Sequence, residues 1–117
     1  SLFSLAQGEY NNWVFGDSIL MDFNTGSPVI GVRNSKVGPT ASTISDKYGN
    51  LLFYADMLYN SPLQNYGGRV WSNNNTIMQN GDSIISGLTQ SLNILPFPCN
   101  DSLFYLFSIG RPIWTNN

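Results

Sequence analysis

The 117-residue chain has the length of one ordinary domain, and 42% of its residues are hydrophobic, which is enough for a modest core. Only 10% of the residues are charged, against about 25% in an average soluble domain. The net charge is −2 and the basic residues are scattered, which argues against a nucleic-acid or anionic-membrane partner. Membrane insertion is also not expected, because no apolar run approaches the roughly 20 residues of a membrane span.

The absence of histidine and the single cysteine exclude several kinds of site. A Ser-His-Asp or Cys-His centre cannot be built from this chain, and a structural zinc site lacks its ligands. Cys99 cannot form an intrachain disulfide, and its place between Pro98 and Asn100 predicts a semi-buried structural residue in a turn. No phosphate-binding glycine motif is present. We therefore expect no metal site and no cofactor.

Residues 1–10 are expected to be a signal-peptide remnant or a flexible N-terminus. Ser4 and Ala6 have the small side chains that precede a signal-peptide cleavage site, and the mature protein would then begin at Gln7. Residues 11–117 are expected to form one all-β domain, which opens at residues 11–16.

The first predicted hairpin joins residues 19–23 to residues 27–30. The connecting residues are Asn-Thr-Gly, and Gly26 supplies the left-handed conformation that a three-residue hairpin loop needs. Pro28 cannot donate a hydrogen bond to a strand ladder, so it indicates an edge position or the start of a strand.

Residues 40–56 form the clearest hairpin in the chain. A β-branched segment, residues 42–45, leads into Asp-Lys-Tyr-Gly-Asn, in which Asp46 and Gly49 have the chemistry of a tight turn. Residues 51–55 follow with no polar alternation, so we expect a strand that is covered on both faces. A short buried helix is the alternative interpretation of this apolar run.

A related pattern returns at residues 89–107. Leu-Phe-Tyr occurs at residues 52–54 and again at 103–105, an offset of 51 residues. The turn of the second copy is expected to be two residues longer. Repeats at this spacing are typical of propeller blades, although two buried hairpins of any all-β protein can look alike.

Between these copies, residues 57–68 are predicted to be a long loop that carries Tyr59 and Tyr66. Residues 69–72 and 76–78 flank three asparagines and predict another short hairpin. No segment shows the apolar periodicity of a helix. The expected fold is all-β, with antiparallel hairpins that form about two β-propeller-like blades or, alternatively, a small β-sandwich.

The chain resembles the propeller-like N-terminal region of large secreted Bacteroidetes surface proteins, many of which are labelled gliding-motility-associated and carry PKD modules. The resemblance covers residues 11–109 and depends on the order and spacing of short motifs. In chain order they are NNWVFG (11–16), MDF (21–23), GSPV (26–29), TISD (43–46), GNLLFY (49–54), VW (70–71), MQNG (78–81), TQS (89–91) and FY (104–105).

The resemblance implies a secreted, extracellular or outer-surface location and a non-enzymatic module for adhesion through protein or polysaccharide. Similar regions continue for several more blades, whereas this sequence contains about two repeats. Two blades cannot close a propeller, which has four to eight. If this sequence is part of a longer protein, further blades pair with the open strand edges. If it is not, the open edges predict a homo-oligomer, or else a different compact sandwich.

The candidate binding residues are Tyr59, Tyr66, Trp71 and Asp56. Aromatic rings offer an apolar face for stacking on sugars, and Asp56 follows the buried strand where the predicted loop begins. Core packing between blades is the alternative role for Trp71. A different function, a fragment of a carbohydrate-active enzyme, would need two of the seven carboxylates at a fixed separation. Most of these acidic residues lie where turns favour Asp, so no catalytic residue is assigned.

Overall fold

The structure is a computed structural model, and it describes residues 8–16, 18–32, 37, 41–60, 65–82, 84–85 and 92–110. It confirms the predicted all-β class: the described strands form three antiparallel sheets, none of which is closed into a barrel. The elements are η1 (Gly8–Tyr10), β1 (Asn12–Phe15), β2 (Ile19–Asp22), β3 (Val29–Val32), β4 (Ala41–Ser45), β5 (Leu51–Asn60), β6 (Asn65–Ser72), β7 (Ile84–Ile85), β8 (Leu92–Pro96) and β9 (Phe104–Ser108).

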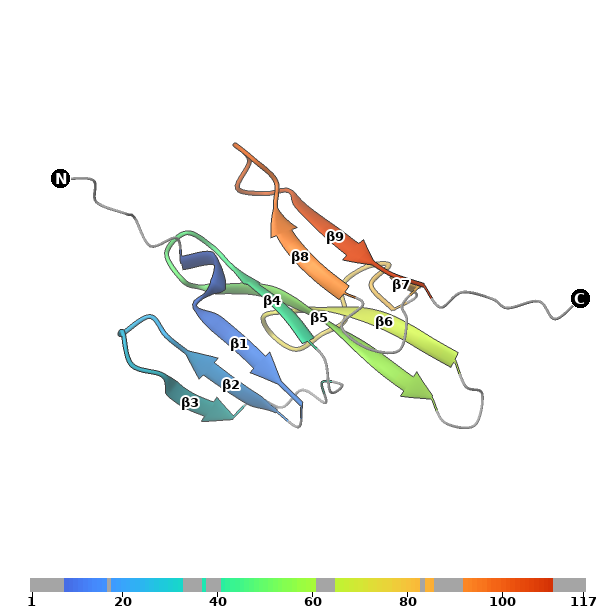
Figure 1. Ribbon diagram of the computed structural model, residues 1–117, viewed down its shortest axis with the longest axis horizontal. Helices are drawn as coiled ribbons and strands as arrows, with labels where there is room; N and C mark the ends of the chain where they lie inside the picture. The colour runs from blue at the N-terminus through green and yellow to red at the C-terminus, as the bar shows by residue number, and fades with distance from the viewer. Residues whose placement is uncertain are drawn as a thin grey trace, which may run out of the picture.

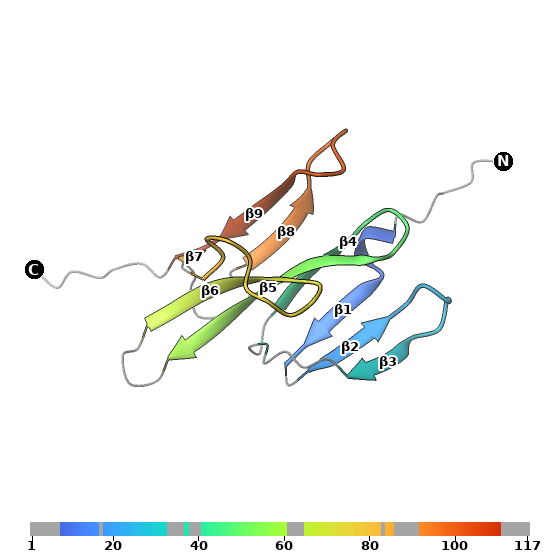
Figure 2. The ribbon, with the colours of Figure 1, turned by 180° about the vertical axis from the view of Figure 1, so that it is seen from behind.

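Each sheet is built from strands that follow one another in the sequence. The first sheet has the order β1-β2-β3, the second β4-β5-β6-β7, and the third β8-β9. The second sheet, which we call the central sheet, lies between the other two in both views (Figures 1 and 2). The β-sandwich considered as the alternative fold has one interface between its two sheets. The described sheets form two such interfaces, one on each side of the central sheet.

The turns form where the sequence predicts them. Gly26 has a φ of 83° between β2 and β3, and Asp22 accepts a hydrogen bond from the backbone of Asn24 in the same turn. Pro28 lies immediately before β3, as a residue without an N–H donor should. In the β4–β5 turn, Gly49 has a φ of 84°, and one carboxylate oxygen of Asp46 accepts from two backbone N–H groups. Local chemistry is sufficient to place these turns.

The central sheet is buried on both faces, as the apolar run at residues 51–55 predicts. One face carries Ile44 and Ala55, which pack with Leu92 and Ile94 of β8. The opposite face carries Tyr54, which packs against Val14 and Leu20 of the first sheet and against Trp71. Each adjacent sheet therefore covers one side of the β4–β5 hairpin.

The two hairpins that resemble each other in sequence also resemble each other in form. Residues 46–50 connect β4 to β5 and residues 97–103 connect β8 to β9, so the second turn is two residues longer, as predicted. Phe53 and Phe104 occupy matching positions, and their rings meet edge to face with centroids 5.0 Å apart. The match is incomplete, because Tyr54 is fully buried whereas Tyr105 is exposed. In addition, residues 12–32 form a sheet of their own outside the two predicted repeats.

The prediction of a long loop at residues 57–68 is wrong. Strand β5 continues to Asn60 and β6 begins at Asn65, with Met57 paired to Gly68 across the sheet. Gly67 and Gly68 indicate a loop only when their neighbours in the sequence are considered without their contacts in space. A Cβ at Gly68 would lie 3.0 Å from atoms of Ile84 and Leu92, so a glycine is needed where β7 pairs with β6 and β8 packs on the sheet.

The prediction that Cys99 is semi-buried is also wrong. Cys99 is exposed and has a φ of 59° in the turn between β8 and β9. The tip of this turn extends beyond the apolar packing of the sheets, so no described residue covers the thiol there.

The N-terminal boundary differs from the expected one. Residues 8–10, expected to be flexible, form η1, and Gly8 packs against the β4–β5 turn. The proposed cleavage site and Gln7 lie outside the described residues, as does Trp114.

We predict that Gly8→Ala lowers the free energy of unfolding by about 1–3 kcal/mol, because overpacking a buried contact has a cost of this size. The new Cβ would lie 2.4 Å from the backbone nitrogen of Gly49 and would push η1 away from the turn. Urea denaturation measures the change. Gly31→Ala is the matched control, since no atom of the described residues lies within 4 Å of its Cβ position. Equal effects of the two substitutions would contradict the prediction.

Candidate functional site

Two of the four predicted binding residues, Asp56 and Trp71, lie together on the central sheet. Asp56 is fully buried and stands directly opposite Arg69 in the β5–β6 pairing. The guanidinium of Arg69 donates to both carboxylate oxygens of Asp56, and the indole Nε1 of Trp71 donates to Oδ1 at 2.9 Å. Arg69 also lies over the Trp71 ring, 4.9 Å from its centroid.

These contacts give Asp56 and Trp71 a structural role. A buried carboxylate is tolerated when it is paired and hydrogen-bonded, as this one is. Trp71 also stacks on Tyr54, with an interplanar angle of 11°. Packing in the core, the alternative role considered for Trp71 from the sequence, is therefore what the structure shows.

The other two predicted residues, Tyr59 and Tyr66, face each other in the strand register rather than lying in a loop. Tyr59 of β5 pairs with Tyr66 of β6 at the end of the sheet that is farthest from the β4–β5 turn. Their side chains lie outside what the structure describes.

A groove of about 690 Å³ lies elsewhere, where β1, β4 and β8 meet. Each of these strands forms an edge of its own sheet. The volume is within the range of ligand-binding clefts, about 300–1,000 Å³. The lining residues come from all three strands and from η1: Tyr10, Trp13, Val14, Phe15, Ala41, Ser42, Thr43, Leu92, Asn93, Ile94 and Leu95.

One wall of the groove is aromatic. Tyr10, Trp13 and Phe15 are each about half exposed. The Trp13 indole is fixed in orientation, because Nε1 donates to the backbone oxygen of Tyr10 at 2.9 Å. The rings of Phe15 and Phe23 contact Trp13 with centroids 6.2 and 4.9 Å away. Trp13 is therefore a rigid apolar platform whose hydrogen-bond donor is already used.

The floor of the groove is held by side chains of β4. Ser42 accepts a hydrogen bond from the backbone N–H of Ile94 on one side, and Thr43 donates to the backbone oxygen of Asn12 on the other. These two bonds connect β4 to β8 of the third sheet and to β1 of the first sheet, and so set the width of the groove. Asn93 is exposed and adds polar hydrogen-bonding capacity to the wall formed by β8.

The sequence of β1 contains a pattern that indicates this site. Asn12, Trp13, Val14 and Phe15 alternate between buried and exposed positions along β1. Period-two alternation with an aromatic residue at each exposed position indicates a sheet with an apolar outer face. The same residues belong to the NNWVFG motif of the family resemblance, which does not by itself show which side chains are exposed.

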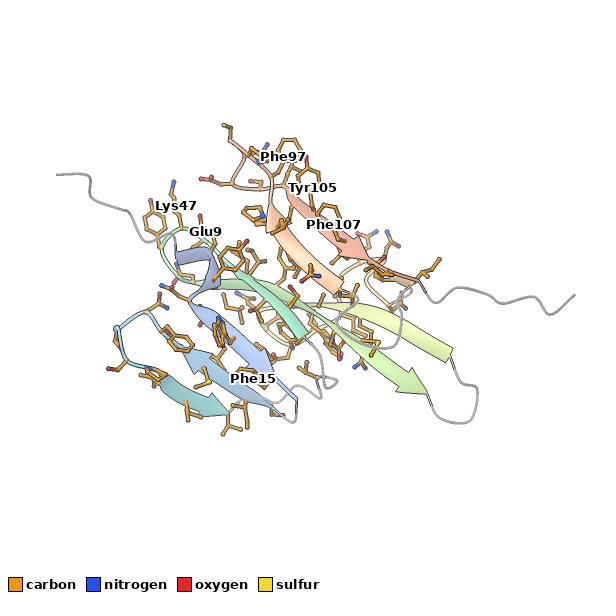
Figure 3. All side chains as sticks on the ribbon, in the orientation of Figure 1. Glu9, Phe15, Lys47, Phe97, Tyr105 and Phe107 are labelled. Atoms are coloured by element: carbon orange, nitrogen blue, oxygen red, sulfur yellow. The ribbon has the colours of Figure 1, made fainter. Side chains whose placement is uncertain are left out.

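A second cavity, of about 450 Å³, lies between the tips of the β4–β5 and β8–β9 hairpins. One carboxylate oxygen of Glu9 is buried there without a hydrogen-bond partner among the described residues. Lys47 pairs with Asp101 at 3.2 Å, which raises the pKa of the Lys47 ammonium. The hydrogen bond from the Asn50 side chain lowers the pKa of Asp46. Figure 3 shows Glu9 and Lys47 close together at this end of the molecule.

Neither cavity brings metal-binding groups together. Among the described residues, no three His, Cys, Asp or Glu side chains are placed so that they could hold a metal ion. In the same part of the chain, no helix has the length and apolar character needed to cross a membrane.

Comparison with known proteins finds no family model, no curated protein and no solved structure that matches the chain.

We predict that Asp56→Asn lowers the free energy of unfolding by about 3–5 kcal/mol, because it leaves the largely buried guanidinium of Arg69 without its counter-ion. Asn has nearly the same shape as Asp, so the loss reports the charge. Lys47→Ala, which removes an exposed ion pair, is the control and should leave stability unchanged. Thermal or urea unfolding of both variants makes the comparison. If Asp56→Asn were as stable as the parent, the structural role of the pair would be refuted.

Proposed function

We propose that this chain is a secreted or cell-surface, non-enzymatic β-rich module for adhesion, and that the groove between β1, β4 and β8 binds polysaccharide. The observation that carries the proposal is the fixed and half-exposed ring of Trp13 in that groove. This assignment moves the binding role from Tyr59, Tyr66, Trp71 and Asp56 to Tyr10, Trp13 and Phe15.

The chemistry of the groove favours a sugar chain over a small charged ligand. Aromatic rings pack against the apolar faces of pyranose rings, while exposed amide groups bond to the hydroxyls. Among the described residues, no Asp, Glu, Lys or Arg lines the groove. A rigid Trp13 also loses little conformational entropy when a ligand binds.

A secreted or cell-surface location is supported by the sequence. The low content of charged residues, the surface rich in Asn, Ser, Thr and Gly, and the signal-peptide-like residues before Gln7 all favour it. The resemblance to secreted surface proteins points in the same direction.

The binding proposal is tested by affinity electrophoresis in gels that contain soluble xylan, mixed-linkage β-glucan or mannan. We expect at least one polysaccharide to retard the protein, and we expect Trp13→Ala to weaken binding by about tenfold or more. Tyr48→Ala is the matched control, because Tyr48 is a more exposed aromatic residue that does not line the groove. Equal loss of binding in both variants would contradict the assignment of the groove. Retardation by none of the polysaccharides would contradict the proposed polysaccharide binding.

The enzyme alternative has a separate test. A carbohydrate-active enzyme that uses paired carboxylates would release reducing sugar ends from the same polysaccharides. We expect no release above the buffer control. Hydrolysis that disappears when Asp or Glu residues are replaced one at a time by their amides would overturn the non-enzymatic part of the proposal.

A further inference from the structure

The first sheet has an apolar face that no described part of the chain covers. Side chains on this outer face come from alternate positions of β1, β2 and β3, in the rows Trp13–Met21–Ile30 and Phe15–Ile19–Val32. Ile30 is 69% exposed and Val32 86% exposed. The opposite side of the same sheet packs on the central sheet through Val14 and Leu20. We call the six-residue surface the first outer face.

The third sheet has a similar surface at the other end of the molecule. Leu95 pairs with Tyr105, and Asn93 pairs with Phe107, on the side of the β8–β9 hairpin that faces away from the central sheet. The ring of Tyr105 lies 5.0 Å from that of Phe97 and 5.8 Å from that of Phe107. Figure 3 shows these three rings in a row along β9. We call Asn93, Leu95, Phe97, Tyr105 and Phe107 the second outer face.

The interior of the molecule shows what kind of surface packs on such faces. Each internal interface joins one side of a sheet to the facing side of the next sheet along the chain. Between the central and third sheets, Phe53 meets Phe104 edge to face, and aliphatic residues fill the remaining space. Aromatic and aliphatic side chains of similar sheets are therefore sufficient to hold two sheets together here.

We propose that the second outer face of one copy docks on the first outer face of another copy of this chain. This contact continues the existing order of sheets. The first sheet of the second copy packs on the third sheet of the first copy, just as the third sheet packs on the central sheet within one copy. None of the residues that define the two faces is charged, so the contact does not desolvate an unpaired charge.

The exposed area supports association that depends on concentration. At their exposed fractions, the side chains of the first outer face leave on the order of 500 Å² of apolar surface. That is near the upper limit for the largest apolar patch of a typical monomer, about 300–600 Å². It is somewhat less than the roughly 800 Å² per partner of a standard interface. A weak, reversible contact between copies is the expected result.

The proposed contact is head-to-tail. The first outer face is mostly aliphatic and the second mostly aromatic, and they lie on opposite sides of the central sheet (Figure 1). A pairing of unlike faces leaves one face of each kind free, so it produces either a ring or an open chain of copies. It differs from the strand-edge contact expected from the sequence, because it uses sheet faces and leaves the edges of β1, β4 and β8 unchanged.

Sedimentation velocity from about 2 to 200 μM tests the proposal. We expect the parent chain to form dimers or larger species as concentration rises. Ile30→Ser with Val32→Ser damages the first outer face, and Tyr105→Ser with Phe107→Ser damages the second. None of these four residues lines the groove. Each double variant should associate at least about tenfold more weakly, whereas Tyr48→Ser should behave like the parent.

Mixing the two double variants distinguishes head-to-tail from symmetric pairing. Each variant retains the face that the other has lost, so an equimolar mixture should again form dimers. If association survived in either double variant alone, the contact would be between like faces and the proposal would be wrong. A parent chain that stays monomeric over the whole range would also overturn it. Near-ultraviolet circular dichroism of each variant confirms that the fold is retained.

Discussion

Burial of the β4–β5 hairpin on both faces is the constraint on which the rest of the structure depends. Tyr54 packs on the first sheet, whereas Ile44 and Ala55 pack on the third. A sheet with two apolar faces needs a partner on each side, and this chain supplies them from residues before and after the hairpin. The order of the sheets in space therefore follows their order in the sequence.

Buried polar groups determine how the sheets align. Asn12 is buried at the start of β1 and donates to the side chain of Ser45 and to the backbone oxygen of Gly49. A one-residue shift of β1 would leave that amide unsatisfied in the core, which is costly. Asp56 and Arg69 specify the pairing of β5 with β6 in the same way. Apolar packing brings the elements together, and these few polar contacts select one register.

The surfaces available for binding follow from this packing. Among the described sheets, the one at either end has a single neighbour, so its outer face keeps side chains that an inner sheet would bury. The edge strands β1, β4 and β8 of the three sheets meet, and the resulting groove is held in shape by Ser42 and Thr43 of β4. Trp13 and Phe15 belong both to the groove and to the first outer face, and Asn93 and Leu95 belong both to the groove and to the second. A ligand in the groove and a second copy would therefore compete for some of the same side chains.

The sequence by itself determined the all-β class, the turns at Gly26 and Asp46, the longer second turn and the burial of residues 51–55, because each depends on conformational preferences of adjacent residues. Only the tertiary structure decided that residues 57–60 and 65–68 lie in strands, since Gly68 is required by Leu92 of a different sheet. It also decided that Asp56 has Arg69 as its partner, and that Trp13 lines a groove. Such contacts join residues that are distant in the chain, and local patterns carry no information about which distant strands will meet.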